Sequence, residues 1–199
     1  HGDGTLEKQI ATLKAWIAAG ATPPASDTSI LETLVVPTLP ASSGPRPVTA
    51  AAVTADGSRL AVGTGNGVDI FRLEAGRPVG KPVVSIADGP GVVKALHFNR
   101  DGTRLVVAGG ITGLRGIAEI RDAANGTLLM AFGGHRDLIY DAELSPDEAT
   151  LATAGYDRSI KLWNVADGSL QRSIDVHNAA VFDLAWHPSG KVLASASAD

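Results

Sequence analysis

The sequence predicts an all-β fold built from repeated four-stranded units, with a short helix near the start of the chain. Three observations support this prediction. From about residue 48 onward, short β-rich runs alternate with turn dipeptides such as Asp56-Gly57 and Asn125-Gly126, and no run keeps helical spacing. Segments of this region recur at a regular interval. The residues before 48 differ in composition and contain a stretch with helical spacing.

Residues 5–20 are expected to form one amphipathic helix. Their apolar side chains recur three and four positions apart and form a single stripe: Leu6, Ile10, Leu13, Trp16 and Ile17. Gly20 favours the end of the helix, and Pro23 and Pro24 prevent its continuation. Because a helix this short is marginal alone in water, we expect it to pack on another part of the protein.

Residues 23–47 have the composition of a linker, with prolines spread among serine, threonine and alanine. An apolar stretch from Leu31 to Leu39 lies inside this segment. A fully solvated linker would not need such a stretch, so we expect these residues to dock on another part of the protein.

Four segments in the second part of the chain align with one another, at residues 48–63, 92–108, 139–155 and 181–197. Their turns are anchored at Asp56, Asp101, Asp147 and Ser189, with separations of 45, 46 and 42 residues. This interval is the period of four-stranded β-propeller blades, roughly 40–45 residues. The sequence therefore predicts blades at 48–89, 90–133 and 134–175 and an incomplete blade at 176–199.

The third unit resembles a WD repeat. Gly134-His135 stands in the place of the family's Gly-His pair, and residues 161–164 (Lys-Leu-Trp-Asn) stand where the family closes with Trp-Asp, with Asn replacing the Asp. The resemblance implies a buried structural tetrad, in which a His, a Ser or Thr, an Asp and a Trp form a hydrogen-bonded chain. Carried over position by position, these residues are His135, Thr153, Asp157 and Trp163.

The other units match the repeat less completely. The fourth unit begins the same pattern with His177, Ser195 and Asp199, and the closing Trp would follow Asp199. We therefore expect the chain to be a piece of a longer protein. The first two units lack the Gly-His pair and the Trp, and their third strands end near Phe71 and Asp122.

A second resemblance concerns the front of the chain. Residues 13–21 are similar to the last helix of small cytochrome c domains that precede WD repeats in some bacterial, planctomycete-like proteins. The residues that carry this similarity are Trp16, Ile17, Gly20 and Ala21. The resemblance implies that residues 1–22 end such a domain, that a haem c site lies upstream, and that the protein is periplasmic. A generic amphipathic helix is the alternative. In the parent propeller, residues 31–39 would supply the outer strand of the closing blade, or else form an ordinary docked linker.

Composition argues against several classes of function. The formal net charge is −4 without a basic block, which argues against nucleic-acid binding. No apolar run approaches the roughly 20 residues that span a bilayer. Because the chain has no cysteine, it cannot form a disulfide, a thiolate zinc site or a covalent haem attachment of its own. The histidines fit structural or surface positions of the repeat, and we expect neither a cofactor nor a metal in this chain.

The sequence predicts a non-catalytic scaffold that binds a protein partner. Propellers present loops at the ends of rigid blades, and we expect Tyr140, Tyr156 and Phe182 to contact the partner. The alternative is a propeller-type enzyme, such as a lactonase or a quinoprotein dehydrogenase, whose catalytic residues lie outside this fragment. Such an enzyme needs convergent carboxylates and a metal at the central channel, and the sequence of these blades offers no such set.

Overall fold

The structure is a computed structural model that describes residues 47–199, together with positions 11, 14, 15 and 18 near the start of the chain. These four positions are helical and fall within the helix expected at residues 5–20. The apolar stripe of that helix, the proline-rich segment and the possible strand at residues 31–39 lie outside the described residues. In the part of the chain that is described, no helix has the length and apolar character needed to cross a membrane.

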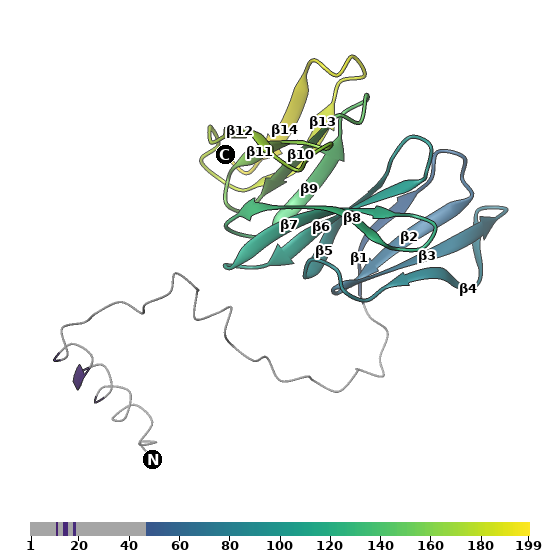
Figure 1. The fold of residues 1–199 in the computed structure, drawn as a ribbon, viewed down its shortest axis with the longest axis horizontal. Coiled ribbons are helices and arrows are strands. Elements are labelled where there is room, and N and C mark those ends of the chain that lie inside the picture. The colour runs from purple at the N-terminus through teal and green to yellow at the C-terminus, as the bar shows by residue number, and fades with distance from the viewer. Residues whose placement is uncertain (1–10, 12–13, 16–17, 19–46) are drawn as a thin grey trace. The chain divides into compact units, whose positions relative to one another are not determined.

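Between residues 48 and 197, fourteen strands form four antiparallel sheets (Figure 1). The first sheet contains β1 (Val48–Val53), β2 (Arg59–Thr64), β3 (Gly67–Glu74) and β4 (Arg77–Ile86). The second contains β5 (Val92–Phe98), β6 (Arg104–Ile111), β7 (Arg115–Asp122) and β8 (Leu128–His135). The third contains β9 (Ile139–Leu144), β10 (Thr150–Gly155), β11 (Ile160–Asn164) and β12 (Leu170–Ile174), and the fourth contains β13 (Val181–Trp186) and β14 (Leu193–Ser197).

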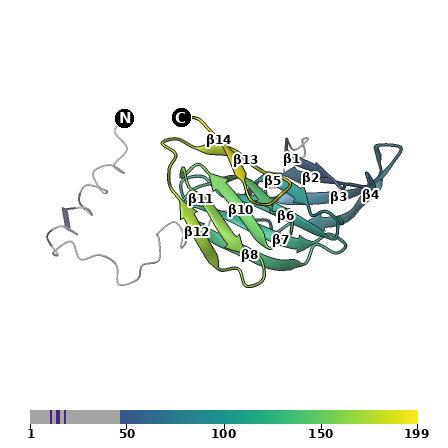
Figure 2. The same cartoon turned by 90° about the horizontal axis from the view of Figure 1, so that it is seen from above.

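Each strand pairs with the strand that follows it in the chain, so that every sheet is a simple meander. The first strands of successive sheets, β1, β5, β9 and β13, lie next to one another, and the remaining strands fan outward from them (Figures 1 and 2). This arrangement confirms the predicted all-β fold, a partial β-propeller made of three four-stranded blades and a two-stranded part of a fourth.

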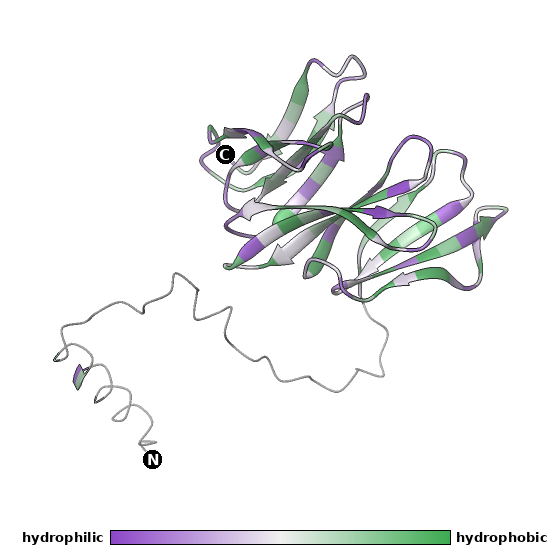
Figure 3. Ribbon diagram, in the orientation of Figure 1, coloured by the Kyte–Doolittle hydropathy of each residue, from purple (hydrophilic) through white to green (hydrophobic). Residues whose placement is uncertain are grey.

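The strands contain many apolar residues (Figure 3). Their side chains pack between neighbouring sheets. Strand β6 shows how the sequence achieves this, because its residues alternate between the two faces of the second sheet. Leu105 and Val107 pack against the first sheet, whereas Val106 and Ala108 pack against the third. All four side chains are fully buried. The sequence of a strand that is buried on both faces is a continuous apolar run and does not alternate between polar and apolar residues.

The turn between the first and second strands has the same backbone conformation in every sheet. One residue of each turn takes a left-handed conformation: Gly57 (φ 69°), Gly102 (φ 73°), Glu148 (φ 57°) and Gly190 (φ 70°). Glycine adopts this conformation without steric cost, whereas glutamate does not. The carboxylate of Glu148 accepts a hydrogen bond from Asn99 Nδ2 at 3.1 Å, in the turn of the neighbouring sheet. The backbone of the third turn is thus strained at Glu148, and a hydrogen bond connects this turn to the second one.

The boundary between the second and third blades differs from the predicted one in one respect. Gly134 and His135, which open the third unit in the sequence, form the end of β8 in the second sheet. The backbone of His135 pairs with Gly116 of β7, although its side chain bonds residues of the third sheet. A sequence unit therefore begins on the outer strand of one blade and continues in the next.

Candidate functional site

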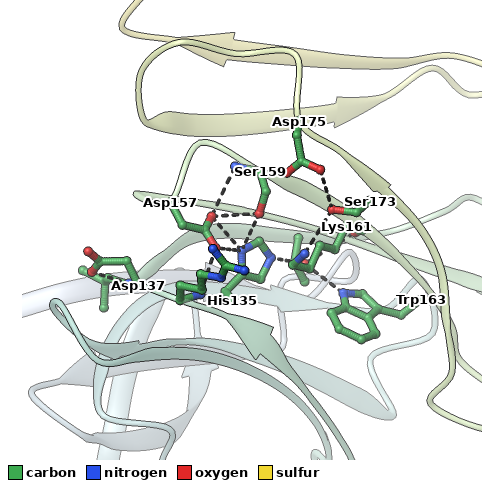
Figure 4. Close-up of polar contacts among 11 residues, drawn as sticks. His135, Asp137, Asp157, Ser159, Lys161, Trp163, Ser173 and Asp175 are labelled. Carbon is green, nitrogen blue, oxygen red and sulfur yellow. Dashed lines mark hydrogen bonds and ion pairs between the residues drawn. The ribbon is translucent and has the colours of Figure 1, made fainter.

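The side chain of His135 lies at the centre of a hydrogen-bonded chain in the third blade (Figure 4). Its Nδ1 lies 3.0 Å from Asp157 Oδ1, and its Nε2 lies 2.8 Å from Thr153 Oγ1. Trp163 Nε1 donates to the same Thr153 oxygen at 2.9 Å. Every donor is satisfied when Trp163 donates to Thr153, Thr153 to His135 and His135 to Asp157. His135, Thr153 and Trp163 are buried, so the structure brings the four members of the structural tetrad together inside the blade.

Asp157 also fixes the turn between β10 and β11. Its carboxylate accepts hydrogen bonds from the backbone N–H of Arg136 at 2.9 Å and from the hydroxyl of Ser159 at 2.9 Å. Burial raises the pKa of Asp157, but the hydrogen bonds from His135, Arg136 and Ser159 outweigh it and hold the pKa below its usual range. The carboxylate is therefore ionised at neutral pH and holds Arg136, His135 and the turn in one arrangement.

The fourth unit repeats this geometry with its own residues. His177 Nδ1 lies 3.0 Å from Asp199 Oδ1, and His177 Nε2 lies 2.9 Å from Ser195 Oγ. The backbone N–H of Asn178 donates to Asp199 at 2.8 Å, as Arg136 does to Asp157 in the third blade. The structure thus brings together the three residues that the sequence singles out in this unit.

A different polar network replaces the tetrad in the second blade. Arg121 pairs with Leu105 across the strands as Trp163 pairs with Leu151, so Arg121 occupies the place of the Trp. Arg121 Nε donates to Glu119 Oε2 at 2.7 Å, and Arg121 Nη1 and Nη2 donate to Asp88 Oδ1 and to the Asp88 carbonyl at 3.1 and 3.0 Å. Arg121 is only 3% exposed and Glu119 only 7%. Burial raises the pKa of Glu119, and Arg121 counteracts this effect.

The sequence alone did not predict this network. Its signal is the pair of charged residues two positions apart in Glu119-Ile120-Arg121, next to the apolar residues Ile117 and Ala118. Because residues two apart in a strand share a face, that spacing indicates an ion pair on one side of the sheet. The partner Asp88 comes from the connection between β4 and β5, and the sequence alone gives no sign of it.

Side-chain carboxylates on β9 join the inner strands of three blades. Asp141 Oδ1 lies 3.0 Å from His97 Nε2 of β5, and Asp141 Oδ2 accepts the backbone N–H of Leu184 in β13 at 2.9 Å. Glu143 accepts the backbone N–H of Trp186 at 2.8 Å. These strands make no main-chain ladder with one another, so the two carboxylates supply hydrogen bonds between neighbouring blades.

Tyr140, Tyr156 and Phe182 form a cluster at the surface, which we call the aromatic surface. Tyr140 is half-buried, and the other two are exposed. The three residues come from β9, from the turn between β10 and β11, and from β13. The ring centroids of Tyr140 and Phe182 are 5.0 Å apart in an edge-to-face arrangement, and those of Tyr140 and Tyr156 are 6.3 Å apart. Tyr156 is 53% exposed and Phe182 47%. The structure therefore brings the three predicted contact residues together, although they lie as much as 42 residues apart in sequence.

The aromatic surface adjoins a hollow along the inner strands. This hollow has a volume of about 280 Å³ and is lined by Tyr140, Phe182, Asp141, Asp183 and Lys94, among others. Within residues 47–199, no group of three or more histidine, aspartate or glutamate side chains is arranged to hold a metal ion. The hollow is thus lined by aromatic and charged side chains.

Comparison with known proteins identifies the repeated unit. The WD domain, G-beta repeat family matches residues 126–164 and 168–199. The matched residues of this chain, 126–164 and 168–199, are therefore similar to WD repeats. The first of the two WD repeats starts in the turn before β8 and ends with β11, so it spans the outer strand of the second blade and the first three strands of the third. Residues before 126 lie outside the matched ranges, in blades where Phe71 and Arg121 replace the Trp.

Several curated proteins are similar to parts of these WD repeats and blades. A probable cytosolic iron-sulfur protein assembly protein, Ciao1, of Culex quinquefasciatus is 39% identical over 79 residues, which is 37% of this chain and 23% of the relative. Pre-mRNA-processing factor 19 of Caenorhabditis elegans is 38% identical over 72 residues, 36% of this chain and 15% of the relative. Coronin-7 of Rattus norvegicus is 29% identical over 145 residues, 68% of this chain and 15% of the relative. The chain thus spans less than a quarter of the length of these three proteins.

Proposed function

We propose that this chain is part of a non-catalytic scaffold that binds a protein partner through the aromatic surface. The observation that carries the proposal is the gathering of Tyr140, Tyr156 and Phe182 from three separate elements into one cluster at the surface. Exposed large aromatic side chains in contact with each other are unusual on a surface without a partner, and aromatic residues dominate the binding energy of protein interfaces.

The frame under the aromatic surface favours binding because it holds the rings in place before a partner arrives. The backbone N–H of Tyr156 donates to the Leu138 carbonyl at 2.9 Å, and Asp157 ties the same turn to His135. Tyr140 and Phe182 follow directly on Ile139 and Val181, which are both fully buried. A surface whose side chains are already ordered loses less conformational entropy on binding than a flexible one.

The relatives also favour a scaffold. Their names refer to different processes, iron-sulfur protein assembly in one case and pre-mRNA processing in another. A shared binding frame fits such diversity better than a shared reaction does, because one rigid fold presents different loops and side chains to different partners.

Peptide selection by phage display on the full chain tests the proposal. We expect the selected peptides to bind wild-type protein and to lose about tenfold or more in affinity for the Tyr156→Ala and Phe182→Ala variants. Leu170→Ala is the matched control, because Leu170 is 48% exposed on β12 and lies outside the aromatic surface. Peptides that bind all three variants equally would show that the partner surface lies elsewhere.

A relation to c-type cytochromes and a periplasmic location are further proposals, which rest on the similarity of residues 13–21. The coding sequence upstream of the His1 codon tests them. We expect it to contain a Cys-x-x-Cys-His haem attachment motif, followed by a methionine shortly before His1. If neither is present, the cytochrome proposal fails. Stoichiometric calcium in the purified parent protein would instead favour the propeller-type enzyme.

A further inference from the structure

The hairpin of β3 and β4 differs from the corresponding hairpins of the other complete blades. Its two strands stay paired out to Glu74 and Arg77, with a tight turn at Ala75-Gly76. Figure 2 shows this hairpin projecting from the rest of the first sheet. In the second and third sheets, the turns at residues 122–127 and 164–169 close the hairpin nearer to the sheet. We call residues 71–83 of the first sheet the basic arm.

Three cationic side chains of the basic arm are exposed and have no ionic partner in the part of the chain that the structure describes. Arg72, Arg77 and Lys81 make neither an ion pair nor a side-chain hydrogen bond within residues 47–199. The arm contains one acidic residue, Glu74, and so has a net charge of +2 in a chain whose formal net charge is −4. The corresponding turns of the other two blades contain Asp122 and Asp167 and neither lysine nor arginine.

The outer edge of the basic arm is unsuited to pairing with another strand. Between the paired residues of β3 and β4, the four residues 80–83 of β4 lie opposite the single residue Phe71 of β3. This mismatch makes a wide bulge in the ladder. Pro78 and Pro82 supply no backbone N–H. Bulges and prolines of this kind protect an edge from main-chain pairing. A partner must therefore recognise the side chains of the arm, which include Val79 (43% exposed) and Val83 (54% exposed) beside the three cations.

We propose that the basic arm binds an acidic segment of a protein partner. Three unpaired cations on a narrow hairpin complement a short run of carboxylates, and the two exposed valines provide apolar contact beside them. An anionic membrane surface fits less well, because lipid-binding segments cluster roughly four to eight basic residues and the arm has three. This binding surface is separate from the aromatic surface, and neither proposal depends on the other.

A fluorescence anisotropy titration of the full chain with a fluorescein-labelled decaglutamate peptide tests this proposal. We expect binding at low ionic strength that weakens as salt approaches about 0.15 M. The Arg72→Glu, Arg77→Glu and Lys81→Glu triple variant should lose about tenfold or more in affinity. Arg172→Glu is the matched control, because Arg172 is exposed on β12, the outer strand of the third sheet, and should change affinity less than about twofold.

The other outcomes overturn the proposal. One is that the wild type does not bind the peptide, and another is that the triple variant binds it as tightly as the wild type. A third is that Arg172→Glu loses as much affinity as the triple variant, which would mean that the peptide is attracted by overall charge and not by a defined site. Binding to phosphatidylserine vesicles but not to the peptide would assign the arm to a membrane. Circular dichroism shows whether the triple variant folds. If it does not, the Arg77→Ala, Lys81→Ala double variant, a milder change of the same arm, is tested in its place with the same expected results.

Discussion

Thr153 connects the two halves of the tetrad through a single hydroxyl group. It accepts a hydrogen bond from the indole of Trp163 and bonds the ring of His135, in a position with no exposure to solvent. Residues of the same size without a hydroxyl would fit the space but leave a buried indole N–H and a buried imidazole nitrogen without partners. Such unsatisfied groups cost more than the hydrogen bond itself contributes.

The Thr153→Val variant should therefore lose about 1–3 kcal/mol of unfolding free energy. Urea denaturation followed by tryptophan fluorescence measures this loss. Thr150→Val is the control, because Thr150 lies on the same strand and its hydroxyl has no partner among the hydrogen bonds of residues 47–199. Equal stability of the Thr153 variant and the wild type would contradict the role assigned to the tetrad.

His97 should make stability depend on pH. Its hydrogen bond with Asp141 raises the pKa of His97 more than burial lowers it, and the charges of Asp141, Glu143 and Asp183 raise it further. A histidine with a raised folded-state pKa contributes stability that is fully present below its unfolded pKa of about 6.5 and is lost as the pH rises through the folded value. We expect the urea midpoint to fall over this range in the wild type and to fall less in His97→Gln. Identical pH profiles would refute the assignment.

At the scale of the element, the sequence predicted most where one sequence unit contains all the partners. The tetrad joins residues of the third unit, and the resemblance of this unit to a WD repeat implied His135 and Asp157 as members. One ion pair of Arg121 depends on Asp88 in another element, and the hydrogen bond that Asn99 donates to Glu148 depends on two turns meeting across blades. Contacts of this kind follow from strand register and blade packing, which no single segment of sequence specifies.

The Arg121→Met variant tests the network of the second blade. It leaves Glu119 buried without its partner and should lose about 3 kcal/mol of unfolding free energy. Adding Glu119→Gln removes the uncompensated charge and should restore a large part of that loss. Thermal and urea unfolding of the two variants and the wild type measure both effects. A double variant less stable than Arg121→Met would show that the charge of Glu119 is stabilised by something other than Arg121.

At the scale of the whole molecule, stability should be highest in the middle blades. The second and third sheets are covered on both faces by neighbours, and in β6 and β10 nearly every residue is buried. The first and fourth sheets each have one neighbour among the described residues, and β1 and β14 are mostly exposed or half-buried. Burial between sheets, rather than the ladders within them, accounts for this gradient.

Native-state hydrogen exchange checks the gradient directly. We expect the backbone amides of β6 and β10 to exchange only through global unfolding, and those of β1 and β14 to exchange faster through local opening. Protection that is uniform across all four sheets would mean that the blades unfold as one unit. Protection highest in β1 or β14 would contradict the packing described above.

The position of His135 has a consequence for how a protein of this kind gains or loses blades. Because this residue ends the outer strand of one blade while its side chain is bonded inside the next, the third sequence unit carries both halves of a junction between blades. Duplication of such a unit therefore also copies the residues on both sides of the contact between blades, so that the new blade can make the same contact with its neighbours. Loss of such a unit leaves an intact contact for the same reason. A unit built like the third can therefore be added or removed together with its contacts to the next blade.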